Sequence, residues 1–589
     1  MHVISILYRY AYTPIKFGKA KFVYLHNTIW SMNLKSAFSV FIILPLLSGL
    51  MLWVAWPPLP LAFLAFGAMV PLLIAEKVIS ERYTKYTSLK VWLALYLGLL
   101  LWNIATTWWI GNASLVGGLF ANFANPVLMT LPFMLARNTR KQFGNRLGYA
   151  SLVFYWMAFE SIHLRWELTW PWLSLGNVFA INHTWIQWYE FTGVFGGTLW
   201  IWLSNLLLFY ILYDKIFPGE KKIVPPISPF KKYQPVIFLV LLLLIPILIS
   251  KIIYTNYEEI GKPVNVTVLQ PNFDPYTEKF DIPYAVQMEK MKNISEQKLT
   301  DSTDYLVWPE TSIQKDIWLD KIPYEKPVRD LLKLIDSFPQ LTIVLGINGF
   351  ERYNSKEEAS VTARELLLRQ SNPDGPDTIY YDIYNTALQI DVSKQLPYYH
   401  KSKLVPGVER MPYPQFFKFL GDKAIELGGI SGSLGTQKER TVFYNKDSIG
   451  VAPVICFESV FGEYVSDYVN NGAQLIFIVT NDGWWGNTSG YKQHSVYAKL
   501  RSIETRRCIA RSANTGISCF VDQCGNMSQA TSWREDAVIN ETLLANNEIT
   551  FYVKYGDYLA RVALWMSGFL LVMTAISVRL QKRKNKISV

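Results

Sequence analysis

Glu310 and Cys456 each stand at the end of an apolar run, in VWPETS and VICFES, and Lys401 lies between them in HKSKLVP. A thiol attacks only as a thiolate, and an unperturbed cysteine is mostly protonated at neutral pH. It therefore needs a base, a cation or a helix N-terminus beside it. The turn after Cys456 leads into a predicted helix, while Glu310 and Lys401 supply a carboxylate and an ammonium. The set indicates nucleophilic catalysis by Cys456.

Other roles for the histidines and cysteines have less support. Only His400 and His494 fall in the same segment, so a cysteine–histidine pair is thinly supported. No cluster has zinc spacing and no HExxH occurs, so we expect no metal. Cys508 is expected to be a buried thiol in a helix. Whether Cys519 and Cys524 form a bridge across their hairpin stays open.

The segment 258–555 alternates short strands with helices, which is typical of a layered α/β domain. Chemistry in such domains gathers at the carboxyl ends of the strands, where Glu310 and Cys456 are expected. The predicted strands are Val264–Phe273, Asp304–Ser312, Leu341–Asn348, Tyr384–Asp391, Ile449–Ser459 and Leu475–Asp482, the helices are Gly462–Ala473 and Gln493–Ala513, and Gly516–Ser528 is a hairpin.

Apolar segments long enough to cross a bilayer flank this domain. The chain of 589 residues is 51% hydrophobic and only 17% charged, whereas soluble chains average about 25% charged. Glu160 and His163 close one apolar segment, either as functional groups at membrane depth or as interfacial residues. The eight predicted spans are Ala37–Trp56, Leu59–Ala75, Val91–Ile110, Leu115–Ala136, Leu147–Ile162, Trp185–Tyr213, Val236–Ile253 and Tyr558–Val578.

The distribution of Lys and Arg sets the orientation of these spans. Basic residues fill alternate loops, such as 77–90 and 137–146, whereas WPPLP and GNAS carry no charge. The alternation places both termini in the cytoplasm and accounts for the net charge of +11, so we expect no nucleic-acid partner. We expect a membrane domain of seven helices over 1–257, an extracytoplasmic catalytic domain over 258–555, and a last helix with a basic cytoplasmic tail over 556–589.

WPE, KSKLVP and CFES, in this order, resemble the Glu–Lys–Cys motifs of the nitrilase superfamily. With spans before and after them, the chain resembles the apolipoprotein N-acyltransferase family, whose members are embedded in a membrane. LQPNF, NDGWWG, RSANTGIS and WPWLSLG match further motifs of that family. The resemblance implies an α/β nitrilase-like sandwich, with layers in the order α-β-β-α, inserted between the transmembrane helices of a domain with eight spans.

By this resemblance Cys456 is the nucleophile, Glu310 the general base and acid, and Lys401 the oxyanion stabiliser, with Lys403 as a rival for that place. A carboxylate with this duty needs a raised pKa, so we expect Glu310 to be buried. The implied supporting residues are Glu409, Glu458 and Asn481, and the implied substrate-binding residues are Phe280, Phe457, Trp484 and Trp485.

Some stretches depart from the family or lie outside its motifs. Gly407–Val408–Glu409 stands where the family has Phe-Gly-Glu, so the glycine is shifted by one position. Phe457 takes the place of a common tyrosine, and Phe280 that of a tryptophan. The glycine-rich stretch Pro414–Gln437 is interpreted either as a lid or as a surface loop.

The resemblance implies transfer of an acyl chain from a phospholipid to the N-terminal α-amine of a diacylglyceryl-cysteine lipoprotein, through a thioester and with ping-pong kinetics. It implies contact with membrane lipids, no cofactor, a monomer, and a bacterial inner-membrane protein whose catalytic domain faces the periplasm. Two alternatives stay open: a membrane-tethered amidase or nitrilase that uses water, and a transporter or receptor whose outer domain only binds a ligand.

Overall fold

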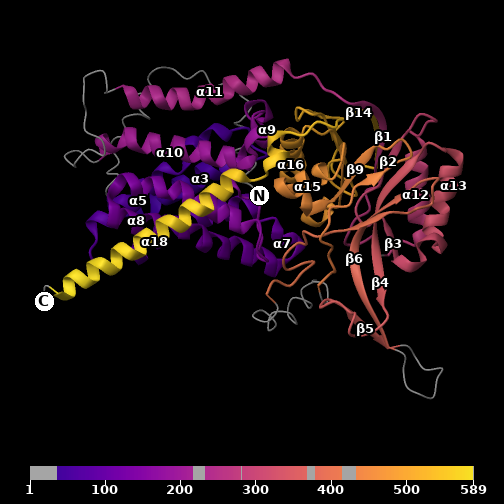
Figure 1. The fold of residues 1–589 in the computed structure, drawn as a ribbon, viewed down its shortest axis with the longest axis horizontal. Helices are drawn as coiled ribbons and strands as arrows, with labels where there is room; N and C mark the ends of the chain where they lie inside the picture. The colour runs from indigo at the N-terminus through magenta and orange to yellow at the C-terminus, as the bar shows by residue number, and fades with distance from the viewer. Residues whose placement is uncertain (1–35, 217–232, 280, 368–377, 414–432, 588–589) are drawn as a thin grey trace, which may run out of the picture.

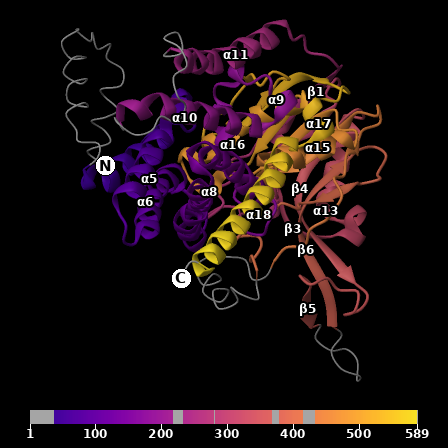
Figure 2. The same cartoon turned by 60° about the vertical axis from the view of Figure 1, so that its left-hand side comes forward.

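The computed structural model describes residues 36–216, 233–279, 281–367, 378–413 and 433–587, with helices at one end and two sheets at the other (Figure 1). The same separation is visible in Figure 2, where β3 to β6 lie away from α5, α6 and α10. The helices of the first end are α3 (Leu44–Ala55), α5 (Val70–Arg82), α6 (Thr87–Thr107), α7 (Ile110–Ala113), α8 (Leu115–His163), α9 (Tyr189–Thr192), α10 (Val194–Ile216), α11 (Gln234–Asn256) and α18 (Tyr558–Ile587).

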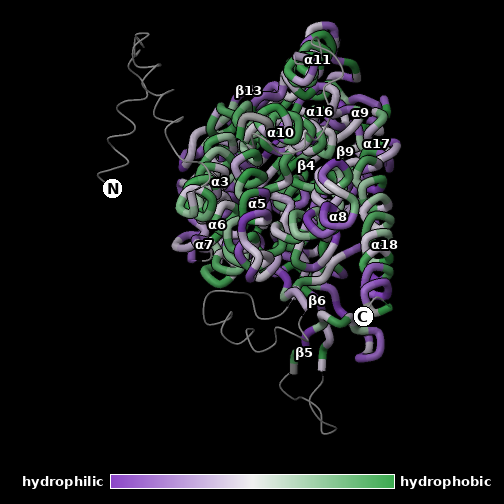
Figure 3. The backbone as a smooth tube through the Cα atoms, turned by 90° about the vertical axis from the view of Figure 1, so that its left-hand side faces the viewer, coloured by the Kyte–Doolittle hydropathy of each residue, from purple (hydrophilic) through white to green (hydrophobic). Residues whose placement is uncertain are grey.

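The helices of the first end are apolar enough to be surrounded by lipid. Only 6% of the apolar window of α11 is buried, so one side of this helix packs on its neighbours and the rest is open to contact with lipid. In Figure 3, α18 is hydrophobic over much of its length and hydrophilic near its C-terminal end. Six helices of the described ranges are long and apolar enough to cross a membrane, Ala62–Arg82, Thr87–Thr107, Leu115–His163, Val194–Tyr213, Gln234–Asn256 and Tyr558–Asn585, and the apolar helix Ser39–Ala55 is shorter.

Two glycines set helix boundaries that differ from the predicted spans. Leu115–Ala136 and Leu147–Ile162 both fall within α8, which is interrupted at Gly144, where φ is 82° and ψ is 178°. The predicted span Trp185–Tyr213 starts too early, because α9 ends before Gly193, whose φ is 58°, and the apolar helix long enough to cross a membrane is Val194–Tyr213. A Cβ at Gly193 would also lie 2.3 Å from the ring of Tyr552, so only glycine fits this corner.

Two sheets form the other end. The larger has the strand order β14–β1–β2–β4–β6–β5, with β3 beside β4 and β7 beside β6, and the smaller has the order β13–β12–β11–β10–β9–β8. The strands are β1 (Lys262–Gln270), β2 (Tyr305–Val307), β3 (Ile313–Trp318), β4 (Thr342–Tyr353), β5 (Arg364–Leu367), β6 (Thr378–Ile390), β7 (Tyr398–His400), β8 (Phe443–Tyr444), β9 (Gly450–Ile455), β10 (Leu475–Thr480), β11 (Ile509–Ala513), β12 (Cys519–Val521), β13 (Met527–Ser528) and β14 (Ala537–Ala545).

The alternation of side chains along the strands produces two cores. Tyr305 and Val307 of β2 share a core with the smaller sheet, and the Tyr305 ring lies 5.1 Å from that of Phe477 on β10. Leu306, between them, belongs to the second core, which also holds apolar residues of α12 (Tyr284–Glu296) and α13 (Lys326–Ser337). Both faces of β2 are therefore buried.

The predicted helix Gln493–Ala513 is too long. The helix α16 spans Ser489–Thr505 and is followed by Arg506, whose φ of 51° is left-handed and ends the helical path. Ile509–Ala513 instead forms β11 and pairs in parallel with β10. Cys508 accordingly precedes a strand, although it is buried as expected, and all four cysteines of the chain are free thiols.

We expect Phe477→Ala to destabilise the α/β end by about 3–5 kcal/mol, because Phe477 is fully buried between the sheets and its loss leaves a cavity. The melting temperature of the detergent-purified chain should fall. Tyr324→Ala, which removes an exposed aromatic ring from the same domain, is the control and should leave it unchanged. Equal melting temperatures for both variants would contradict this account of the core.

Candidate active site

Glu310, Lys401 and Cys456 come together at strand ends, as predicted. Glu310 follows β2, Lys401 follows β7 and Cys456 follows β9. The Lys401 ammonium donates to Glu310 Oε1 at 2.9 Å and to Glu409 Oε1 at 2.8 Å. The exposed fractions of Glu310, Lys401 and Cys456 are 6%, 1% and 7%, and all three line one cavity. Despite the shifted glycine, Glu409 reaches the lysine.

Asn385 on β6 bonds both carboxylates, and no motif in the sequence indicates this role. Its amide nitrogen donates to Glu310 Oε1 at 2.7 Å and to Glu409 Oε1 at 3.2 Å. Glu310 Oε2 accepts a bond of 3.1 Å from the backbone N–H of Asn481. Every oxygen of Glu310 is thus held, which fixes the carboxylate toward Lys401.

The protonation states differ from the prediction in one respect. Burial raises the pKa of Glu310, but the charge and hydrogen bond of Lys401 and the bond from Asn385 outweigh burial and hold it below its ordinary value. The expected burial of Glu310 is therefore correct and its expected raised pKa is wrong. The pKa of Lys401 is far above its usual range, since Glu310 and Glu409 outweigh its burial. Burial and the charge of Glu310 raise the pKa of the Cys456 thiol. The charge of Lys401 acts in the opposite direction, but its effect is smaller.

Glu458 holds the turn that carries Cys456. Cys456 has a φ of 48°, a strained value for a residue with a side chain, and begins the 3₁₀ helix Cys456–Val460. The Glu458 carboxylate accepts from the N–H of Ile455 at 2.9 Å and, with its other oxygen, from the N–H of Ser402 at 2.7 Å and from the hydroxyl of Tyr464 at 2.6 Å. Glu458 thereby joins the Cys456 turn to the segment of Lys401.

Lys403, the alternative to Lys401, and the histidines His400 and His494 bond groups other than Glu310 and Glu409. Lys403 Nζ donates to the Leu164 carbonyl at 3.4 Å and lies 4.9 Å from the centre of the Phe461 ring, away from the carboxylates. His494 contacts the Cys456 carbonyl oxygen at 3.2 Å and the Asp482 carboxylate at 2.9 Å. His400 bonds Thr386, and burial lowers its pKa to about 4. The geometry favours Lys401 over Lys403 as the cation of the site.

The predicted substrate-binding residues take different places. Phe457, Trp484 and Trp485 line the cavity together with Asn481. The Trp485 ring packs 4.8 Å from that of Trp109 in the helical end, which is called the membrane domain below. Trp485 is therefore part of the contact between the membrane domain and the α/β domain. Phe280 lies outside the described residues, as do residues 414–432 of the stretch interpreted as a lid or loop.

Lys279 is a second buried cation. It was not predicted from the sequence, where only the next residue, Phe280, stands at a position of the family motifs. It is 2% exposed, and its ammonium donates to the Glu310 carbonyl at 3.3 Å and to the Thr311 hydroxyl at 2.5 Å. Burial lowers its pKa to about 8, while the charges of Glu310 and Cys456 oppose that fall. Lys279 therefore adds positive charge beside the buried cluster.

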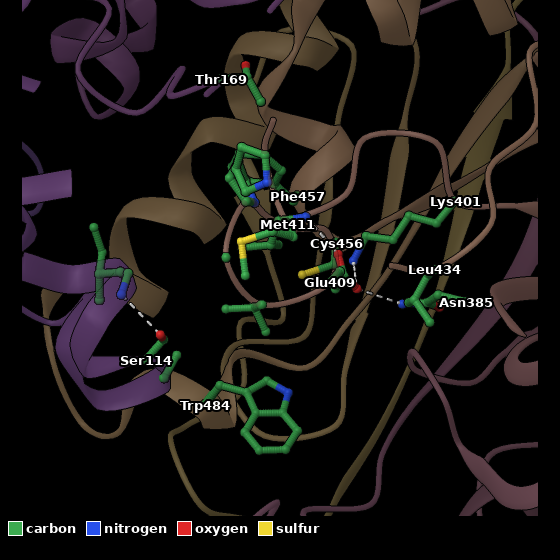
Figure 4. A pocket seen from close by; sticks show the side chains of 18 of the residues that line it. Ser114, Thr169, Asn385, Lys401, Glu409, Met411, Leu434, Cys456, Phe457 and Trp484 are labelled. Atoms are coloured by element: carbon green, nitrogen blue, oxygen red, sulfur yellow. Dashed lines mark hydrogen bonds and ion pairs between the residues drawn. The ribbon is translucent and has the colours of Figure 1, made fainter. Parts of the chain in front are cut away.

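The cavity extends from these residues to the membrane domain and has a volume of about 670 Å³. Figure 4 shows Cys456, Glu409 and Lys401 close together, with Ser114 on a membrane-domain helix, Thr169 and Trp484 around them. Its membrane-side lining is mainly apolar and comes from α7, α8 and the loop after α8: Trp109, Ile110, Ala113, Val116, Phe120, Leu128, Leu168 and Trp172.

Two family models match the chain. Residues 48–207 match the apolipoprotein N-acyltransferase N-terminal domain, and residues 266–546 match the carbon-nitrogen hydrolase model. An apolipoprotein N-acyltransferase of Chlorobaculum tepidum is 30% identical over 91% of this chain and 97% of its own length. The chain belongs to the apolipoprotein N-acyltransferase family. It is therefore an acyltransferase with a nitrilase-like α/β domain, as the sequence motifs predicted.

The chain is also similar to more distant proteins. The apolipoprotein N-acyltransferase of Geobacter metallireducens is 27% identical over 88% of this chain and 92% of its own length. A solved structure of a mutant Nesterenkonia AN1 amidase from the nitrilase superfamily covers 51% of this chain and 97% of its own, with a TM-score of 0.32 and 14% identity.

Lys279→Met should raise the pKa values of Glu310 and Cys456, since it removes a cation beside them. The change at Glu310, the base, moves the low-pH limb of the kcat/KM profile for acyl transfer to higher pH. We expect the limb to move by about one pH unit or more, because a hydrogen bond to a charged group is worth about 1.5–3 kcal/mol and one pKa unit corresponds to about 1.4 kcal/mol.

Lys279→Arg keeps the charge and should keep the position of the limb. Lys290→Met removes a partly exposed lysine and serves as the control. Superimposable pH profiles for Lys279→Met and the unmodified chain would show that this ammonium has no influence on the reacting groups.

Proposed function

We propose that this enzyme transfers an acyl chain from a phospholipid to the N-terminal α-amine of a diacylglyceryl-cysteine lipoprotein, with Cys456 as the nucleophile. One observation carries the proposal: Cys456, Glu310 and Lys401 line a cavity whose other wall is made of apolar membrane-domain residues. A lipid ester can enter such a cavity with its chain against that wall and its carbonyl beside the thiol.

In the first half-reaction Glu310 takes the proton of the Cys456 thiol and the sulfur attacks the ester carbonyl carbon. The oxyanion forms between the Lys401 ammonium and the N–H of Phe457, at the start of a 3₁₀ helix where N–H groups lack helical partners. Removing one such donor typically lowers the rate by about 10²–10³. The carbon–oxygen bond then breaks, and Glu310 returns its proton to the departing lysophospholipid oxygen.

In the second half-reaction the lipoprotein amine attacks the thioester carbonyl. Glu310 takes a proton from the amine nitrogen, the carbon–sulfur bond breaks, and the cysteine sulfur leaves and recovers a proton from Glu310. The products are an N-acylated lipoprotein and the free thiol. Glu409, Asn385 and Asn481 hold Glu310 and Lys401 in place through both steps.

The arrangement in the membrane follows from the charge pattern and the helices. We infer eight spans over 1–257 and 556–589, with α8 counted as two segments divided at Gly144. The α/β domain, 258–555, faces the periplasm of a bacterial inner membrane and has α-β-β-α layers. Two sheets with a shared core support this layering. The enzyme works as a monomer and without a nucleic-acid partner.

Incubating the purified chain with phospholipid alone should add the mass of one acyl chain to Cys456, and the adduct should persist until an amine acceptor is supplied. Cys456→Ser should show no labile thioester adduct. Cys508→Ser, which alters a buried thiol remote from the cavity lining, should acquire the adduct like the unmodified chain. Rapid release of free fatty acid without an acceptor would instead indicate a hydrolase.

Labelling of introduced cysteines tests the orientation. In spheroplasts, a maleimide that cannot cross the membrane should label Tyr324→Cys, an exposed position in the α/β domain, and should leave Lys584→Cys in the basic tail unlabelled until the cells are lysed. The native cysteines are buried, so the unmodified chain gives the background. The reverse labelling pattern would overturn the proposed topology.

A further inference from the structure

The membrane-side wall of the cavity contains polar side chains that the acyl-transfer mechanism does not use. Asn125, His163 and Thr169 are each less than one-tenth exposed, and each lines the cavity, as does the half-buried Trp170. Four of their atoms are buried with no hydrogen-bond partner: Asn125 Oδ1, His163 Nε2, Thr169 Oγ1 and Trp170 Nε1. Buried polar groups in native proteins almost always have partners, so this group calls for a ligand.

His163 presents a donor to that ligand. Its Nδ1 accepts the indole N–H of Trp166 at 2.9 Å, so in the neutral ring the proton is on Nε2. The ring is held in place between two aromatic neighbours, stacked on Phe159 at 5.1 Å and tilted against Trp166 at 5.4 Å. The unpartnered Nε2–H is therefore preorganised.

Trp170 and Thr169 add to this donor set. An indole N–H can only donate, and the Trp170 ring is stacked on Trp172 at 5.8 Å. The Thr169 hydroxyl can donate or accept. Asn125 donates through its amide nitrogen to Asn103 at 2.7 Å, which leaves its oxygen as the free acceptor. The wall thus offers two obligatory donors and a hydroxyl, and it suits a group rich in acceptors.

The charges nearby favour an uncharged acceptor over a phosphate. Arg165 is paired with Glu463 at 2.5 Å and with Asp557 at 3.4 Å, and Lys403 bonds the Leu164 carbonyl. Neither residue is part of the cavity lining. The cations that do line it, Lys401 and Arg364 of β5, belong to the α/β end, and Lys401 is already paired with two carboxylates. Among the described residues, the membrane-side wall of the cavity contains no Arg or Lys. Phosphates are bound chiefly by Arg and Lys, whereas a neutral N–H matches an ester carbonyl.

We propose that His163 and Trp170, with Thr169, bind the ester carbonyl of the donor phospholipid that is not cleaved. The inference rests on the proposed function and goes beyond it by giving the membrane domain a polar subsite. One ester carbonyl sits beside Cys456 while the second bonds this wall, and the fixed separation of the two esters aligns the reacting carbonyl with the thiol.

The test compares a phospholipid with two esters and its two regioisomeric analogues, each with one ester replaced by an ether. An ether lacks the carbonyl acceptor. The analogue that keeps the cleaved ester, and has an ether in place of the other one, can still react with Cys456. The rate of acyl adduct formation on Cys456, measured by intact mass at subsaturating lipid, should be about five- to tenfold lower for that analogue. His163→Phe should slow the diester by the same factor and leave the monoether rate nearly unchanged.

Two further variants complete the comparison. Trp170→Phe removes the other donor but keeps an aromatic ring, and it should also reduce the ratio of diester to monoether rates. Phe120→Leu alters an apolar residue of the same wall and should change both rates by the same factor. Equal rates for diester and monoether on the unmodified chain, or equal slowing of both by His163→Phe and Trp170→Phe, would overturn the inference. No adduct from the diester itself would overturn the proposed function as well.

Discussion

The site depends on one buried ammonium, that of Lys401, held between two carboxylates at 2.9 and 2.8 Å. A buried charge is tolerated only when it is paired and hydrogen-bonded, and here Glu310 and Glu409 meet that requirement with Asn385 between them. Burial and the charge of Glu310 keep the Cys456 thiol protonated, whereas Lys401 and Asn385 keep Glu310 ionised. Lys279, which bonds the Glu310 carbonyl, adds a second positive charge that lowers the pKa of Glu310 further.

The α16 helix connects the membrane domain to this cluster. Gln493 and Tyr497, one turn apart, bond the Trp172 indole N–H at 2.7 Å and the Trp172 carbonyl at 3.0 Å. Tyr497 also accepts the Trp56 indole N–H, at 3.0 Å. His494, adjacent to Gln493 in sequence, reaches the Cys456 carbonyl. A shift of the membrane helices would therefore reach the nucleophile through a single helix with fully buried polar contacts.

Local patterns sufficed to predict the strand ends with Glu310 and Cys456, the apolar helices and the family, because each is expressed in contiguous residues. The rest depends on contacts between distant segments. Ile509–Ala513 has a helix-compatible composition, and its pairing with β10 and β12 makes it a strand. Asn385 looks like any polar residue of β6 until it meets two carboxylates. The predicted pKa of Glu310 was wrong because its burial can be inferred from the sequence, whereas its contact with Lys401, which opposes the effect of burial, cannot.

The same trio of side chains can serve hydrolysis or transfer, so what divides the two outcomes is the medium around the thioester. Water enters a site through polar openings, and here the wall facing Cys456 is built from Trp109, Trp172, Trp485 and apolar residues of α7 and α8. Excluding water lengthens the life of the thioester that we propose and strengthens each charge interaction within the site. The membrane domain thus contributes to the chemistry itself as well as to anchoring: it supplies the dry half of an active site whose reacting residues all come from the α/β domain.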